Sequence, residues 1–172
     1  GDVLGGACSA SLRPVSPPWC GCCGAPTAWP VSRCRECSGR RLGFDRARAA
    51  VLYLGPARPL VRAWKERGLR RASTLAADVV ASRLPAPEAD VVTHVPPNAV
   101  RQLRRGRHPA VELAAELAAL GDLEPAGLVA RHGGRRRQAG LGRAARDHNV
   151  AGAFTVTGRV PEHVVLVDDV YT

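Results

Sequence analysis

The sequence predicts a mixed α/β protein in which a cysteine-rich segment, residues 1–43, precedes an α/β domain, residues 44–172. All six cysteines lie in the first segment, which has no apolar periodicity, so something other than hydrophobic burial must hold it together. From residue 44 onwards, short strand-like runs alternate with helical patterns, which is typical of a parallel sheet covered by helices. No apolar run approaches the roughly 20 residues of a membrane span, and no export signal is recognisable, so we expect a cytoplasmic protein.

The first half of the α/β domain is expected to contain a strand and two helices. Residues 49–54, AAVLYL, predict a short strand that ends at a Gly-Pro turn. Residues 59–84 predict a helical stretch that Gly68 divides in two, with Ser73 as a candidate N-cap of the second helix. Two prolines follow and end this helix.

The second half continues the alternation. Residues 89–95 predict a strand and residues 110–120, AVELAAELAAL, predict the clearest helix of the chain. Residues 131–149, rich in Arg and Gly, predict a loop, and residues 152–156 predict a further strand. Residues 164–167, VVLV, are apolar at every position, which suits a central strand of a parallel sheet.

The formal charge of the chain is +10, and Lys65 is the only lysine among 25 basic residues. Coding bias in a GC-rich genome accounts for such an excess of arginine without any functional role. A surface for phosphate groups or nucleic acid is the functional alternative, because guanidinium groups bind phosphate in a forked geometry. The two explanations are compatible with each other.

Four of the cysteines form two Cys-x-x-Cys pairs, Cys20 with Cys23 and Cys34 with Cys37. Two such pairs joined by a short loop can place four thiolates around one tetrahedral ion, so we expect structural zinc in a zinc-ribbon segment. An iron–sulfur centre, disulfides or free thiols are the alternatives, although disulfides are uncommon in a reducing compartment. Cys22 could compete with Cys23 for the ion, whereas Cys8 alone cannot build a second site.

The strand at residues 164–167 leads directly into Asp168 and Asp169. Ligands of open parallel sheets bind beyond the carboxyl ends of the strands. Two carboxylates at that place can accept hydrogen bonds from sugar hydroxyls or hold a divalent cation. A solvated turn is the simple alternative. A nucleotide hydrolase would also need a Gly-rich loop ending in Lys-Ser or Lys-Thr, but Lys65 is followed by Glu66.

The run from Val164 to Thr172 resembles the phosphoribosyl-pyrophosphate signature of type I phosphoribosyltransferases, in which four apolar residues and two acids precede a Thr-rich phosphate loop. Asp168 and Asp169 match the acids that in this family bind the ribose hydroxyls and Mg²⁺. Thr172 matches the first residue of the phosphate loop, and the chain is cut off within that loop. The resemblance therefore implies a truncated phosphoribosyltransferase-like domain, and we expect this fragment to be inactive as a transferase.

The whole chain is similar to the ComF family, a competence-associated family in which a cysteine-pair zinc segment precedes such a domain. Four stretches match in order. They are Cys20–Cys37, Leu60–Gly68, Val95 to Gly106, and Gln138 to Phe154. The chain departs from the family after Gly106, where Arg107, His108 and Pro109 replace an aromatic residue, Asn and Gln, and also in having the single Cys8 where some relatives have further Cys-x-x-Cys motifs.

The resemblance implies a glycosyltransferase site that binds phosphoribosyl pyrophosphate or a related sugar phosphate, with Mg²⁺ beside Asp168 and Asp169. The phosphate groups of this substrate would be neutralised by arginines of the loop that follows the strand at residues 89–95. The Arg-rich loop at residues 131–146 would cover the site. The implied substrate-binding residues are Arg101, Arg104, Arg105, Gln138, Arg146 and Thr172. The acceptor is not implied, and a link to DNA uptake or to nucleotide salvage is expected from the family.

A non-catalytic adaptor of competence that binds single-stranded DNA is the rival hypothesis. It depends on the basic charge, because phosphate contacts need no sequence recognition. Trp19 and Trp29 flank the first cysteine pair and could stack on bases, although packing around the metal is the more ordinary use of such side chains. We assign no role to His94, His108 or His148, because a single histidine is more often structural.

Overall fold

The computed structural model describes residues 11–69, 71–97, 107–132 and 152–171. Two helices come first, α2 at Ala57–Arg67 and α3 at Arg71–Arg83. Strand β1 at Val91–His94 precedes helix α5 at Pro109–Gly121. Four short strands complete the described elements, namely β2 at Glu124–Pro125, β3 at Val129–Arg131, β4 at Phe154–Val156 and β5 at Val164–Val167. None of the helices in these ranges is long and apolar enough to cross a membrane.

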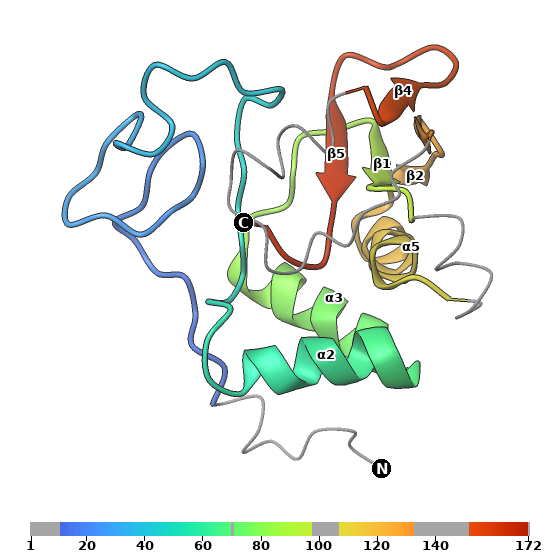
Figure 1. Ribbon diagram of the computed structural model, residues 1–172, viewed down its shortest axis with the longest axis horizontal. Helices are drawn as coiled ribbons and strands as arrows, with labels where there is room; N and C mark the ends of the chain where they lie inside the picture. The colour runs from blue at the N-terminus through green and yellow to red at the C-terminus, as the bar shows by residue number, and fades with distance from the viewer. Residues whose placement is uncertain (1–10, 70, 98–106, 133–151, 172) are drawn as a thin grey trace.

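A small parallel sheet lies at the centre of the α/β part, with the strand order β2-β1-β5. Strand β1 pairs in parallel with β5 from Val91 opposite Val164 to His94 opposite Val167. Because both strands run the same way, His94 and the residues after Val167 come to the same edge of the sheet. Strands β3 and β4 form a separate antiparallel pair, and Figure 1 shows this pair at the end of the molecule beyond the sheet.

The main core lies between the sheet and helices α3 and α5 (Figure 1). The sheet contributes Val92 and Val167, which are 1% and 7% exposed. Helix α5 contributes Leu113, Ala114 and Ala118, and the last two are four residues apart, which is a spacing that places side chains on one helical face. Small alanines at these positions allow the helix to pack closely against the strands.

Several sequence-based predictions are confirmed. The helical stretch does divide at Gly68, which takes a left-handed conformation with φ 60° and ends α2. The strand expected at 89–95 is β1, and the helix expected at 110–120 is α5. The prediction at residues 152–156 is also confirmed by β4.

Three local predictions were wrong. Residues 49–54 do not form a strand, because only Val51 makes a bridge, to Pro14. Ser73 is buried within α3 rather than capping its start. Strand β5 is not central among the described strands, since only β1 pairs with it and Leu166 is 57% exposed. An all-apolar strand therefore exposes one face here, which its sequence alone did not indicate.

The cysteine-rich segment forms a lobe of loops beside the α/β part (Figure 1). Its own small core contains only cysteines and a few apolar neighbours, the last of which is Leu42. The chain before this lobe is attached to the α/β part, because Leu12 packs with Ala57 and Val79. The amide of Leu52 also donates a hydrogen bond of 2.9 Å to the carbonyl of Arg13.

Candidate functional site

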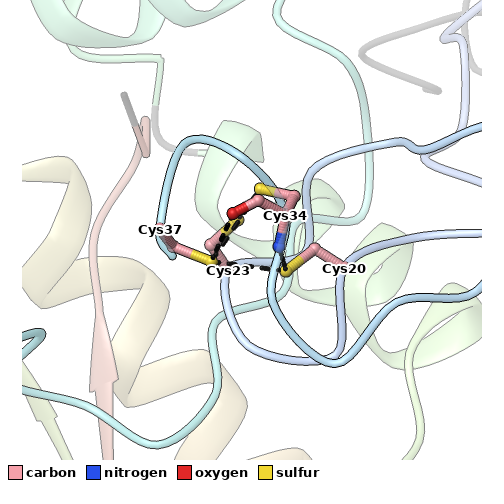
Figure 2. Close-up of side chains that lie close together, drawn as sticks. All are labelled: Cys20, Cys23, Cys34 and Cys37. Carbon is pink, nitrogen blue, oxygen red and sulfur yellow. Dashed lines mark hydrogen bonds between the residues drawn. The ribbon is translucent and has the colours of Figure 1, made fainter. Parts of the chain in front are cut away.

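The four cysteines of the two Cys-x-x-Cys pairs converge on one point (Figure 2). Their sulfur atoms all lie within 4.8 Å of one another. The Cys20–Cys37 and Cys23–Cys34 sulfur distances are 3.5 Å, and the Cys34–Cys37 distance is 3.8 Å. Four thiolates bound tetrahedrally at about 2.3 Å from one zinc ion would be separated by about 3.8 Å. The group is therefore compatible with a metal ion such as zinc.

Two tight turns bring these sulfurs together. In the first turn the amide of Gly24 donates to the carbonyl of Cys20 at 3.0 Å, and Gly24 has a φ of 71°, a conformation that side chains other than glycine adopt at a cost. In the second turn the amides of Cys37 and Ser38 both donate to the carbonyl of Cys34. The amide of Cys34 also donates to the sulfur of Cys20 at 3.2 Å, which links the two turns.

The backbone around Cys20 favours a thiolate there. Burial raises the pKa of the Cys20 thiol, but amide hydrogen bonds, led by that of Cys23, outweigh it and lower the pKa to about 6. At Cys37, burial and the neighbouring sulfurs of Cys20 and Cys34 raise the pKa to about 12. Sulfurs this close cannot all ionise without a cation between them, so the cluster as a whole favours a bound cation.

Cys22 does not belong to the group, although it lies between two of its members in the sequence. Its side chain is buried, and its sulfur accepts a long hydrogen bond of 3.8 Å from Arg33 Nη2. The sequence left open whether Cys22 competes with Cys23, and the geometry selects Cys23. Cys8 lies outside the described residues.

The acidic pair follows β5 at the carboxyl end of the sheet. The amide of Asp169 donates to Asp168 Oδ1 at 2.8 Å, and Lys65 Nζ lies 2.8 Å from Asp169 Oδ2. The side chain of Asp169 is only 8% exposed, while that of Lys65 is 38% exposed. Helix α2 thus supplies a cation to a largely buried carboxylate.

Asp168 differs from Asp169 in its surroundings. Asp168 lies at the surface, yet partial removal of its carboxyl from water and repulsion from the Asp169 carboxylate raise its pKa to about 6. The Asp169 amide and Lys65 act in the opposite direction but do not cancel this rise. Asp168 therefore carries its full negative charge only above about pH 7 and accepts a proton more readily than an ordinary aspartate.

A pocket of about 260 Å³ is lined by Lys65, the residue that also pairs with Asp169. The end of α2 and the start of α5 form its walls, and five of its lining residues are charged. Glu112 accepts hydrogen bonds from Trp64 Nε1 at 3.4 Å and from Arg107 Nε. Arg107 and Glu112 thereby balance each other within the wall, and the other charged residues of the lining are Lys65, Glu66 and Arg67.

Two histidines lie near this edge of the sheet. Burial lowers the pKa of His94, the last residue of β1. Burial also lowers the pKa of His108, which lies within electrostatic range of Asp169 and Lys65. His108 Nδ1 is buried and, among the described residues, has no hydrogen-bond partner. Both rings are therefore neutral near pH 7, and His108 presents a buried polar atom beside the acidic pair.

The structure brings together only part of the predicted site. The cysteines form one group, and Asp168 and Asp169 lie side by side at the carboxyl end of a parallel strand. Lys65 was the main omission, because the sequence analysis assigned it no role in the site, although its being the only lysine was a usable signal. The remaining predicted residues lie outside the described residues: Arg101, Arg104, Arg105, Gln138, Arg146 and Thr172.

The two tryptophans near the first cysteine pair differ from the expectation of packing around the metal. Trp29 is 68% exposed and is absent from the core of the cysteine lobe. Trp19 is half-buried, and the guanidinium of Arg48 lies 5.6 Å from its ring centroid. Trp29 thus offers an open aromatic face in a basic protein.

Comparisons of the chain with protein-family models, with curated proteins and with solved structures found no match. The similarity to the ComF family accordingly remains a hypothesis that depends on the sequence motifs.

Proposed function

We propose that this protein binds phosphoribosyl pyrophosphate or a related sugar phosphate, together with Mg²⁺, at the acidic pair, and that the four cysteines hold a structural zinc ion. The observation that carries the proposal is the position of Asp168 and Asp169 immediately after a strand of a parallel sheet, where open α/β sheets bind ligands. A four-cysteine group ahead of such a sheet is the domain order of ComF-like proteins, which the motifs resemble.

The roles of the side chains follow from their positions. Asp168, with a pKa of about 6, is charged above neutral pH and is the more accessible of the two carboxylates for a hydrated cation. The largely buried Asp169 is held in place by Lys65. The zinc ion would stabilise the cysteine lobe and take no part in chemistry, because four protein sulfurs leave no open coordination position.

The position of β5 at the edge of the described strands weighs against this proposal, since a central strand was expected. Lys65 nevertheless connects Asp169 to a pocket, and a solvated turn would not place Asp169 at 8% exposure against a lysine. These two features favour a binding site over a surface turn.

Calorimetric titration with phosphoribosyl pyrophosphate and Mg²⁺ at pH 7.5 tests the acidic pair. We expect the Asp168→Asn, Asp169→Asn double variant to bind at least about tenfold more weakly, because charge-assisted contacts to the cation and the sugar hydroxyls are lost. The matched control is the double variant Asp45→Asn, Asp78→Asn, which makes the same charge change at exposed positions and should bind as the wild type does. Equal binding by both double variants would rule out the acidic pair as the site.

Binding of single-stranded DNA is the second candidate function, and the exposed Trp29 favours it. Stacking of a base on this ring would contribute affinity without sequence preference. A salt-dependent DNA shift that is lost in Trp29→Ala but unchanged in the acidic double variant would support the adaptor hypothesis instead of the sugar-phosphate site.

A further inference from the structure

Lys65 lies between two possible partners. On one side its ammonium group is 2.8 Å from the largely buried Asp169 carboxylate. On the other side it lines the pocket of about 260 Å³ at the junction of α2 and α5. A lysine with a 38% exposed side chain keeps enough rotational freedom in its four-carbon stem to exchange one partner for the other.

The pocket has the features of an anion site. Lys65, Arg67 and Arg107 bring positive charge to its walls, and Pro109, the first residue of α5, also lines it. The walls also hold two acids, Glu66 and Glu112, and Glu112 is bound by Trp64 and Arg107. Three cations against two acids leave the lining with an excess of one positive charge.

We propose that this pocket binds a phosphate-type oxyanion and that Lys65 is a positioning residue, which moves from Asp169 to the anion when the anion binds. Anion binding thereby uncovers the Asp169 carboxylate, which becomes available to a divalent cation. The two sites are coupled through one ammonium group, and the coupling is reciprocal. The inference deepens the proposed function and rests on it for the ligand class.

The coupling explains why a carboxylate of a cation site would be neutralised in the free protein. A buried carboxylate without a counter-ion is costly, and Lys65 removes that cost until both ligands arrive. An anion without a cation would leave Asp169 unpaired, and a cation without an anion would repel Lys65. The arrangement therefore favours binding of the two ligands together, which is the form in which a sugar pyrophosphate with Mg²⁺ presents them.

Inorganic pyrophosphate without added divalent cation is the probe for the anion pocket, with binding measured by calorimetry on the full chain. We expect Lys65→Gln to weaken binding about tenfold, as for loss of one charge-assisted hydrogen bond. Lys65→Arg should retain binding within a few-fold. The matched control is Arg62→Gln, which removes one charge from an exposed position of the same helix and should change binding less than about twofold.

Asp169→Asn separates partner exchange from simple electrostatics. With Lys65 present, this variant should bind pyrophosphate several-fold more tightly, because the lysine no longer has to leave a carboxylate. In the Lys65→Gln background the same change should have little effect, and the difference between the two backgrounds measures the coupling. Equal tightening in both backgrounds would overturn the exchange, and no weakening by Lys65→Gln relative to Arg62→Gln would overturn the pocket assignment.

The outcome for the proposed function is independent of this result. If pyrophosphate binding depends on Lys65 while phosphoribosyl pyrophosphate binding does not depend on the acidic pair, the anion pocket is retained and the sugar-phosphate site is rejected. The reverse pattern would retain the sugar-phosphate site and reject the role of Lys65. Far-UV circular dichroism of each variant confirms that it is folded before binding is compared.

Discussion

At the scale of single residues, Gly24 shows how one backbone position shapes the metal centre. Its φ of 71° turns the chain directly after Cys23, and a Cβ placed on it would lie 2.5 Å from the carbonyl oxygen of Ala47. This backbone oxygen cannot move aside as a flexible side chain would. Glycine is therefore required here both for conformation and for space.

Substitution of Gly24 by alanine tests this requirement, and Gly39 provides a matched control. Gly39 has nearly the same φ, 72°, but a Cβ there meets nothing within 4 Å. Gly39→Ala should cost only the conformational penalty of about 1 kcal/mol, whereas Gly24→Ala should cost a further 1–3 kcal/mol, as roughly expected for overpacking. Urea unfolding followed by tryptophan fluorescence measures both, and equal losses would contradict the steric explanation.

The residues of the acidic site differ in how far the sequence could predict them. Asp168 and Asp169 are adjacent and follow an apolar run, so a local pattern was sufficient. Lys65, His94 and His108 come from three different elements, and only the fold brings them to the same edge. Their roles depend on contacts across long sequence separations, which no local pattern contains.

At the scale of elements, helix α5 shows that a periodic pattern predicts both the element and its buried face. Leu113, Ala114 and Ala118 face the sheet, while Leu120 on the same helix is 56% exposed. The helix begins at Pro109, which suits a first helical position because it lacks an amide hydrogen. Amphipathic helices of this length are therefore the most reliable elements to predict.

Truncation of Leu113 measures how much this buried face contributes. Leu113→Ala should lower the free energy of unfolding by about 2–5 kcal/mol, because it removes a buried side chain and leaves a cavity. Leu120→Ala is the control on the same helix and should change stability by less than about 0.5 kcal/mol. Thermal or urea unfolding monitored at 222 nm gives both values, and a similar effect of the two substitutions would refute the assigned orientation of α5.

The strands were harder to predict than the helices. Residues 49–54 have an apolar, β-prone sequence, yet they form only the single bridge of Val51 with Pro14. Ala50 and Val51 pack instead in the small core that contains Leu12. Residues 164–167 do form β5, but the pattern did not reveal that Leu166 would be exposed at an edge. Pairing partners and strand order are set by the whole fold rather than by local composition.

At the scale of the whole molecule, the cysteine lobe and the α/β part have separate cores. The lobe is centred on the four cysteines with neighbours no later than Leu42, while the main α/β core begins at Trp64. A few contacts join the two parts. Among them, the Ala47 amide donates to the Cys22 carbonyl at 2.7 Å, and Arg48 Nη2 donates to the Gly21 carbonyl at 3.0 Å.

The division into a cysteine lobe and an α/β part was predictable because cysteine spacing and helical periodicity are both local signals. The contacts between the parts were not predictable, since Tyr171, only two residues after the acidic pair, lies within electrostatic range of Cys23 and Cys37 from the far end of the chain. This proximity places the cysteine lobe beside the segment that carries Asp168 and Asp169. Stability of the lobe can therefore affect the order of the acidic site without any direct role of the metal in binding.

Removal of the metal should unfold the lobe and leave the α/β core intact, because the two cores share no residues. Elemental analysis should first give one zinc ion per chain, retained in Cys22→Ser and lost in Cys23→Ser, since only the second sulfur belongs to the group. After chelation, trypsin should cleave at arginines of the lobe at least about tenfold faster, because cleavage follows local opening. Arg33, Arg35 and Arg40 report on the lobe, while Arg62 and Arg67 report on α2. Equal acceleration at both sets of sites, measured by mass spectrometry, would show that the metal holds the entire chain as one cooperative unit, and the separation into two cores would then be wrong.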